Sequence, residues 1–176
     1  MRIVEASPAE IDVVLCVERL AFSRDDEPHL VAALLRDQTA QPSISLLAYE
    51  ADRPVGHALF TKVALVGSSP HVPSAILAPL AVVPTSQSQG VGRALIEHGA
   101  SALAGAGVQL LFVLGEPAYY TRYDFVPATP YGLHAPYPIV PDEAWMVRSL
   151  APNLLGTVKG TVTCAASLTR PEYWRE

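Results

Sequence analysis

The segment from Ala75 to Leu95, AILAPLAVVPTSQSQGVGRAL, contains the most informative pattern in this chain. An apolar run over 75–83 is followed by Pro84, by a polar loop with glycines at 90 and 92, and then by residues with helical spacing. The first N–H groups of a helix have no intrahelical partner, and the helix dipole places partial positive charge there. Glycine lets the backbone approach an anion without a side chain in the way. The segment therefore predicts a strand, a loop and a helix N-terminus that binds a phosphate-bearing ligand.

Two common glycine-loop patterns fit this segment poorly. The phosphate loop G-x-x-x-x-G-K-[ST] needs lysine and a hydroxyl after its last glycine, but Arg93 and Ala94 follow Gly92. The dinucleotide pattern G-x-G-x-x-G needs a third glycine where this chain has Leu95. Glu116 lies near the place of a ribose-binding acid, but about 70 residues precede the loop, whereas that pattern normally follows an early strand. An NAD(P)-binding oxidoreductase is therefore disfavoured, although it stays open as an alternative.

A third pattern, Q/R-x-x-G-x-G/A, fits residues 87–92 (QSQGVG) without a mismatch. This loop resembles the acetyl-CoA loop of the GNAT superfamily of N-acetyltransferases. The resemblance extends to residues 80–82 (LAV), similar to the family's L-x-V strand end, and to residues 119–125 (YYTRYDF), similar to its [FY]-Y-x-[KR]-x-G-F segment. The departure is Asp124 in place of glycine, and aspartate tolerates a left-handed backbone better than most residues. The resemblance covers about residues 75–127. The sequence in and around this stretch resembles a poorly characterised bacterial branch of predicted acetyltransferases.

The resemblance implies a fold, a co-substrate and site residues. The fold would be α+β (mixed α/β), a GNAT-like single domain over residues 1–176 with a mixed, mostly antiparallel central sheet flanked by helices. Residues 151–176 would supply a C-terminal extension or a last strand and tail. Tyr120 aligns with the tyrosine that many relatives use as general acid. The residues implied to bind acetyl-CoA are Leu80, Ala81, Val82, Gln87, Ser88, Gln89, Gly90, Val91, Gly92 and Arg93.

Periodicity along the chain predicts the same order of elements. Strands are expected at about 2–6, 44–50, 55–65, 75–83, 108–114, 143–150 and 156–165. Helices are expected from a capping box at 7–10 to about 22, at 28–36, from 90 to about 105, and after the proline at 117. Five prolines between 127 and 141 predict an ordered but irregular excursion.

Composition limits the class of protein. Half of the 176 residues are apolar and 16% are charged, which is typical of a folded chain. The net charge of −5, with only two lysines, argues against nucleic acid or an anionic membrane as partner. Cys16 and Cys164 are expected to be small buried thiols and not a disulfide, and two cysteines alone cannot complete a four-ligand zinc site. No apolar run is long enough to span a bilayer and no signal peptide is evident, so a cytoplasmic location and no metal are expected.

The chemistry expected of the site is acetyl transfer from a thioester to an amine. A phenol such as Tyr120, with a reference pKa of about 10, stays protonated at neutral pH and can donate to a thiolate. The alternative is that Tyr120 only packs beside Tyr119 and Tyr123, which are expected to be structural. No base is evident: Glu116 is the best carboxylate candidate, and His57, His71 and His134 are the histidine candidates. Tyr131 or Tyr137 in the proline-rich excursion is expected to face either the acceptor or the protein interior.

The sequence thus predicts a GNAT-type N-acetyltransferase that uses acetyl-CoA and a small-molecule or peptide amine. A CoA or acyl-CoA sensor without turnover is the alternative, because no base is evident and Asp124 departs from the family pattern. A homodimer is left open.

Overall fold

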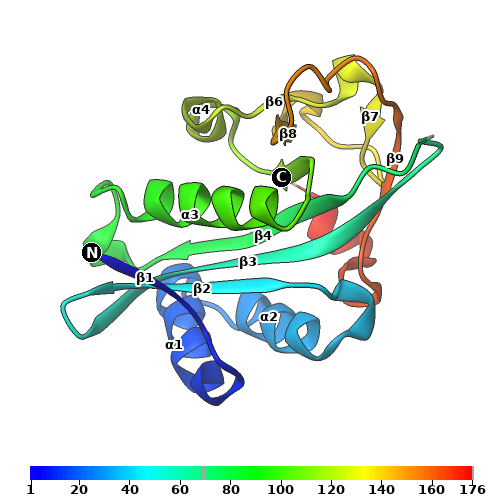
Figure 1. The fold of residues 1–176 in the computed structure, drawn as a ribbon. Helices are drawn as coiled ribbons and strands as arrows, with labels where there is room; N and C mark the ends of the chain where they lie inside the picture. The colour runs from blue at the N-terminus through cyan, green and yellow to red at the C-terminus, as the bar shows by residue number, and fades with distance from the viewer. Residues whose placement is uncertain (69, 176) are drawn as a thin grey trace.

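The computed structural model describes residues 1–68 and 70–175, and its centre is a mixed sheet of nine strands (Figure 1). The strands are β1 Arg2–Glu5, β2 Ile44–Glu50, β3 Arg53–Val66, β4 Ser74–Val82, β5 Leu110–Leu114, β6 Val126–Pro127, β7 Leu133–His134, β8 Trp145–Ser149 and β9 Gly160–Thr163. The helices are α1 Ile11–Phe22, α2 Asp26–Arg36, α3 Val91–Gly105 and α4 Pro117–Tyr120. The predicted α+β fold class is confirmed.

The sheet has the order β1-β2-β3-β4-β5-β8-β6, with β7 and β9 outside this path. Neighbouring strands are antiparallel except for the β4–β5 and β7–β9 pairs. The long strand β3 pairs with β2 and β4 over most of its length, while its end at 64–66 pairs with β9. The C-terminal part of the chain therefore joins the sheet beyond the ends of its neighbours.

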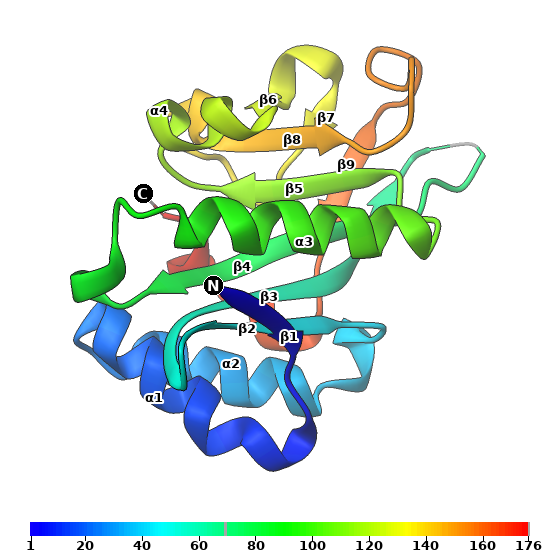
Figure 2. The ribbon, with the colours of Figure 1, turned by 60° about the vertical axis from the view of Figure 1, so that its left-hand side comes forward.

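Helices cover both faces of this sheet. α1 and α2 lie on one face, whereas α3, which connects the parallel strands β4 and β5, lies on the other (Figures 1 and 2). A strand covered on both faces is buried along its length and does not alternate between apolar and polar residues. Accordingly, residues 55–61 of β3 are all buried, including the polar side chains of His57 and Thr61.

Local sequence accounts for the element boundaries. The predicted capping box begins a short 3-10 turn before α1, where the Glu10 carboxylate accepts the Ser7 N–H at 2.7 Å. α3 begins after Gly90, which has the left-handed φ of 87° that glycine adopts without strain. The proline-rich excursion, expected to be irregular, contains the two-residue strands β6 and β7.

The two cysteines match their prediction only in part. Both are free, as expected, but Cys16 is exposed and Cys164 is half-buried. Burial raises the pKa of the Cys164 thiol to about 12. The expectation of two buried thiols was wrong for Cys16, because this position lies on the outer side of α1.

Two further features of the described residues concern membrane-spanning helices and groups of metal-binding side chains. Within 1–68 and 70–175, no helix has the length and apolar character needed to cross a lipid bilayer. Over the same residues, no group of three histidine, cysteine, aspartate or glutamate side chains is placed to hold a metal ion.

The packing of α3 on β3 can be tested with two glycines of the same helix. A Cβ on Gly99 would overlap the Phe60 ring, which is fully buried, whereas a Cβ on Gly105 has no other heavy atom within 4 Å. We expect Gly99→Ala to lower the free energy of unfolding by about 1–3 kcal/mol through overpacking. The control Gly105→Ala is expected to leave it unchanged or raise it by up to about 1 kcal/mol. Urea denaturation measures both, and equal stability of the two variants would contradict the packing described.

Candidate active site

The site begins where the parallel strands β4 and β5 separate. They pair only over Ser74–Ile76 and Leu110–Phe112, although β4 continues to Val82 and β5 to Leu114. Beyond Ile76, β4 keeps its pairing with β3 and β5 keeps its pairing with β8, so each strand stays ordered while the two diverge (Figure 2). The two parallel strands therefore leave a gap between them beyond Ile76 and Phe112.

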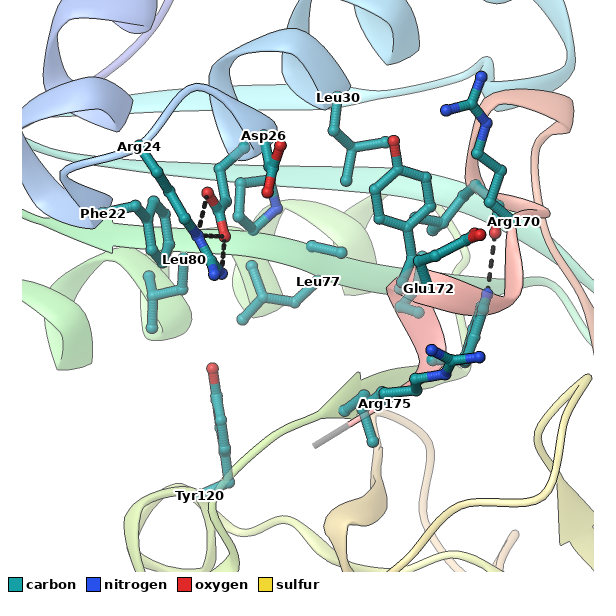
Figure 3. A pocket seen from close by; sticks show the side chains of 18 residues that line it. Phe22, Arg24, Asp26, Leu30, Leu77, Leu80, Tyr120, Arg170, Glu172 and Arg175 are labelled. Atoms are coloured by element: carbon teal, nitrogen blue, oxygen red, sulfur yellow. Dashed lines mark hydrogen bonds and ion pairs between the residues drawn. The ribbon is translucent and has the colours of Figure 1, made fainter.

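A cavity of about 650 Å³ lies next to this gap (Figure 3). Its walls come from the α1–α2 connection and the start of α2, from residues 76–80 of β4, from Leu114 and Tyr120, and from the C-terminal segment 168–175. Four parts of the chain that are distant in sequence thus meet at the open end of the β4–β5 pair.

The glycine loop follows the open end of β4. Residues 87–90 are exposed, and the side-chain amide of Gln87 donates to the Val82 carbonyl at 3.1 Å. Gly92 is buried, and a Cβ at this position would overlap the hydroxyl of Tyr119. Arg93 is exposed and makes no ion pair among the described residues. The loop therefore presents an exposed backbone at the N-terminus of a 15-residue helix.

Of the other residues expected to bind acetyl-CoA, Leu80 lines the cavity and Ala81 is buried in the core. Val83 donates its N–H to the Val55 carbonyl of β3 at 2.9 Å. Because successive N–H groups of a strand point to opposite edges, the N–H of Val82 points away from β3 and toward the gap. This geometry supplies a backbone donor beside the cavity.

Tyr120 is both packed and directed into the cavity. Its ring makes edge contacts with Tyr119 and Phe125, with centroids 4.9 and 5.5 Å apart, and only 9% of the residue is exposed. Figure 3 shows its hydroxyl end pointing toward Leu80 and Arg24 on the opposite wall. The packing that holds the ring and the exposure of its hydroxyl to the cavity are thus compatible.

The two neighbouring tyrosines lie in a cluster behind Tyr120. Tyr119 contacts Tyr123 edge to face at 5.1 Å, and the Arg122 guanidinium lies 5.0 Å from the Tyr119 ring. Burial and the adjacent Tyr123 raise the pKa of Tyr119 to about 12. Asp124 has the left-handed φ of 65° that the sequence predicted for this position.

None of the four predicted base candidates lines the cavity. The Glu116 carboxylate caps α4 by accepting the Ala118 N–H at 3.3 Å. His57 is fully buried in contact with Glu18, while His71 and His134 are exposed elsewhere. None of these four candidates is therefore placed to take a proton from a ligand in this cavity.

The carboxylates that do line the cavity are Asp26, Glu27 and Glu172. Glu27 is held by Arg24, whose Nε lies 2.9 and 3.0 Å from the two carboxylate oxygens. These residues were missed because α2 was predicted to begin two residues later, and because nothing in the sequence links the C-terminus to this site. The acidic run Asp25-Asp26-Glu27 at a helix start was the available signal.

Of the two alternatives for Tyr131 and Tyr137, the structure has the one in which both pack away from the cavity. Tyr137 lies outside the cavity, where its hydroxyl donates to the Thr169 carbonyl at 2.5 Å and its ring contacts Trp174. Trp174 is buried against Trp145, with ring centroids 5.6 Å apart. Tyr131 is partly buried and packs against the core. The excursion therefore supports the cavity wall from behind, and the residues that reach the cavity are C-terminal.

Similarity to known proteins agrees with this geometry. A domain family described as "Acetyltransferase (GNAT) domain" matches residues 41–127. The uncharacterized N-acetyltransferase YjhQ of Escherichia coli K12 is 44% identical over 153 residues, which cover 85% of this chain and 83% of that protein. The chain belongs to the GNAT family of N-acetyltransferases. An NAD(P)-binding oxidoreductase is thereby ruled out as its class.

Two further GNAT relatives were found. The uncharacterized N-acetyltransferase YhbS of E. coli K12 is 31% identical over 86% of this chain and 87% of its own length. The crystal structure of E. coli YhbS in complex with CoA aligns with a TM-score of 0.86 and 28% identity, over 96% of this chain and 92% of YhbS. A GNAT family acetyltransferase from Brucella melitensis in complex with acetyl-CoA aligns with a TM-score of 0.73 and 25% identity, over 95% and 97% of the two chains.

One carboxylate outside the cavity fastens the C-terminal wall of this GNAT site. Asp37, just after α2, accepts hydrogen bonds from the N–H and hydroxyl of Thr39 and from the N–H and hydroxyl of Ser167, at 2.5–2.8 Å. These bonds, above all the one from the Thr39 hydroxyl, hold the pKa of Asp37 well below its usual range. The pKa of Asp37 in the folded chain lies below its unfolded value of about 3.9. The stability that these hydrogen bonds give the fold is therefore fully present above pH of about 3.9, and it is lost as the pH falls through the folded pKa.

We expect Asp37→Ala to loosen residues 166–175 and to increase their backbone hydrogen exchange at neutral pH. The KM for the amine acceptor should rise while the KM for acetyl-CoA stays nearly unchanged. Asp142→Ala is the matched control, because Asp142 also accepts a threonine hydroxyl but that threonine is Thr129, outside the C-terminal segment. If backbone hydrogen exchange of residues 166–175 is unchanged in Asp37→Ala, the Asp37 carboxylate is not what holds this C-terminal segment in place.

Proposed function

We propose that this enzyme transfers an acetyl group from acetyl-CoA to an amine, with the loop 87–93 binding the pyrophosphate, residues 80–82 receiving the pantetheine arm, and Tyr120 acting as general acid. The observation that carries the proposal is the convergence of three features on the gap between β4 and β5. These are a helix N-terminus with an exposed glycine loop, an inward-pointing backbone N–H at Val82, and the Tyr120 hydroxyl in the adjoining cavity.

The loop is suited to a pyrophosphate for three reasons. Its backbone is exposed, the left-handed Gly90 orients it at the start of α3, and the dipole of this helix favours an anion there. Hydrogen bonds to a charged group contribute about 1.5–3 kcal/mol each, so three or four of them would supply most of the affinity. Relatives crystallised with CoA and with acetyl-CoA align with nearly the whole chain, which supports this co-substrate.

The gap between the strands supports polarisation of the thioester. An N–H directed at the carbonyl oxygen, as proposed for Val82, stabilises the negative charge that develops there when the amine attacks. The Val82 carbonyl points to the same edge and is taken by the Gln87 side chain, which fixes the backbone at this position. The gap thus supplies a preorganised donor without any movement of β4.

Tyr120 supports the last step, protonation of the leaving thiolate. A phenol keeps its proton at neutral pH and can donate it as the carbon–sulfur bond breaks. Its ring is held by Tyr119 and Phe125, so its position does not depend on the substrate. A sensor that only binds CoA would not need a proton donor at this place, so the catalytic interpretation is favoured.

No histidine lines the acceptor side of the cavity, and its Glu27 is paired with Arg24. Arg24 occupies both oxygens of the Glu27 carboxylate. Removal of the amine proton is therefore assigned to water in the cavity, or to entry of the amine in its neutral form. Among the described residues, three arginines line the cavity together with its three carboxylates, so the formal charges of the lining balance.

Replacing Tyr120 with phenylalanine tests the acid. The change removes one hydroxyl and little volume, so folding and acetyl-CoA affinity should hold. We expect kcat to fall about 10²- to 10⁴-fold, the range typical of general acid catalysis. Tyr123→Phe is the control from the same aromatic cluster and is expected to keep its turnover. Release of free CoA thiol over a panel of amines measures both, and full turnover of Tyr120→Phe would return this residue to a packing role.

The loop is tested best at Gly90, since valine at Gly92 would also disturb Tyr119. Gly90 has φ of 87° and Gly107 has φ of 89°, and a Cβ at either position meets no other heavy atom within 4 Å. Valine at each therefore carries the same backbone strain, but Gly107 follows the opposite end of α3. Calorimetry is expected to show at least about tenfold weaker CoA binding for Gly90→Val and unchanged binding for Gly107→Val. Equal affinities would overturn the loop assignment.

A further inference from the structure

A buried chain of three polar side chains lies under α1, apart from the acetyl-transfer cavity. His57 of β3 has its Nδ1 2.5 Å from Oε1 of Glu18 on α1, and its Nε2 2.8 Å from the Ser45 hydroxyl on β2. Glu18 and His57 are fully buried, and Ser45 is 8% exposed. The three residues come from three different elements, so their alignment depends on the tertiary fold.

The order of atoms is that of a nucleophile, a base and an acid that orients the base. With neutral His57, the Ser45 hydroxyl donates to Nε2 and the Nδ1–H donates to the Glu18 carboxylate. An acid bonded to Nδ1 fixes the tautomer in which Nε2 can accept a proton. This arrangement allows Ser45 to lose its proton to His57 as the serine attacks a carbonyl.

Ser45 opens onto a second cavity of about 600 Å³. This cavity lies between α1, α2 and the edge of β1 and β2, and it shares no lining residue with the first cavity. Its apolar walls include Ile11, Val14, Leu15 and Leu35. A ligand in it would therefore reach the serine hydroxyl without meeting acetyl-CoA.

One side-chain amide that lines the second cavity could donate to an oxyanion. Gln41 lines it, and the Gln41 side-chain oxygen accepts the Ser43 hydroxyl at 3.1 Å. Among the described residues, nothing accepts a hydrogen bond from the NH₂ group of this amide. Side-chain amides are one of the usual sources of oxyanion donors.

The burial of Glu18 is costly for a purely structural network. Its second oxygen, Oε2, is buried and has no hydrogen-bond partner among the described residues. Burial raises the pKa of Glu18 against the opposing effect of the His57 hydrogen bond. An unsatisfied buried carboxylate oxygen lowers the stability of the fold, and such local violations concentrate at functional sites.

We propose that Ser45, His57 and Glu18 form a second active site that hydrolyses carboxylic esters with an apolar acyl or alcohol group, independently of CoA. Ser45 Oγ bonds to the ester carbonyl carbon while its proton passes to His57 Nε2. The ester C–O bond then breaks, and the leaving alkoxide takes that proton to become an alcohol. Water cleaves the acyl-serine by the same route in reverse, which releases the carboxylic acid and restores the serine hydroxyl.

The test uses the full chain without CoA, with p-nitrophenyl acetate and p-nitrophenyl butyrate as esters and diisopropyl fluorophosphate as the covalent probe. We expect intact-mass measurement to show one phosphoryl adduct per chain, located at Ser45 by peptide mapping. Ser45→Ala should form no adduct, and its rate of ester hydrolysis should be at least about tenfold lower. Ser7→Ala is the matched control, because Ser7 lines the same cavity but is not bonded to a histidine, and it should keep both.

Tyr120→Phe should also keep the adduct and the hydrolysis, which separates this activity from the acetyl-transfer cavity. Acetyl transfer by Ser45→Ala is measured alongside, and normal turnover would confirm that this variant folds. The absence of an adduct on the unmodified chain would overturn the proposal, as would an adduct and hydrolysis that survive in Ser45→Ala.

Discussion

The early end of the β4–β5 pairing is the constraint on which the site depends. A strand inside a sheet normally has both edges hydrogen-bonded, and unpaired buried backbone groups are costly. Here β4 loses one partner after Ile76 and continues to Val82 with one edge open. The opening persists because β3 holds the other edge of β4 and β8 holds the other edge of β5. The sheet thus contains a gap that needs no opening motion to admit a ligand.

The remaining elements close the space around this gap from several directions. The first turn of α2 supplies charged side chains, α4 supplies Tyr120, and the C-terminal segment supplies the last wall. That segment is anchored by Trp174 in the core and by Asp37 at the surface. The acceptor side is therefore built from parts that could vary without altering β4 or the glycine loop, which explains how one scaffold can serve different acceptors.

Local patterns could be predicted from the sequence because neighbouring residues determine them. The apolar run, the glycine loop and the helix from 91 to 105 follow one another along the chain, and the left-handed turn at Asp124 depends on one residue type. The cavity walls were not predictable in the same way, because the contact between Asp37 and Ser167 joins residues 130 positions apart. Without an expected position for the C-terminal segment, the proline-rich excursion was one candidate for the acceptor wall, and of its two alternatives the structure has Tyr131 and Tyr137 packed outside the cavity.

The partners of His57 could not be predicted from the sequence either. Its position in an apolar strand gave no sign of its partners, since Ser45 lies 12 positions and Glu18 lies 39 positions away. Helices cover both faces of the sheet, so His57 is fully buried. A polar side chain in this position must find partners within the protein or remain unsatisfied. The fold supplies a carboxylate on one ring nitrogen and a hydroxyl on the other, and this pairing makes the histidine a candidate for proton transfer.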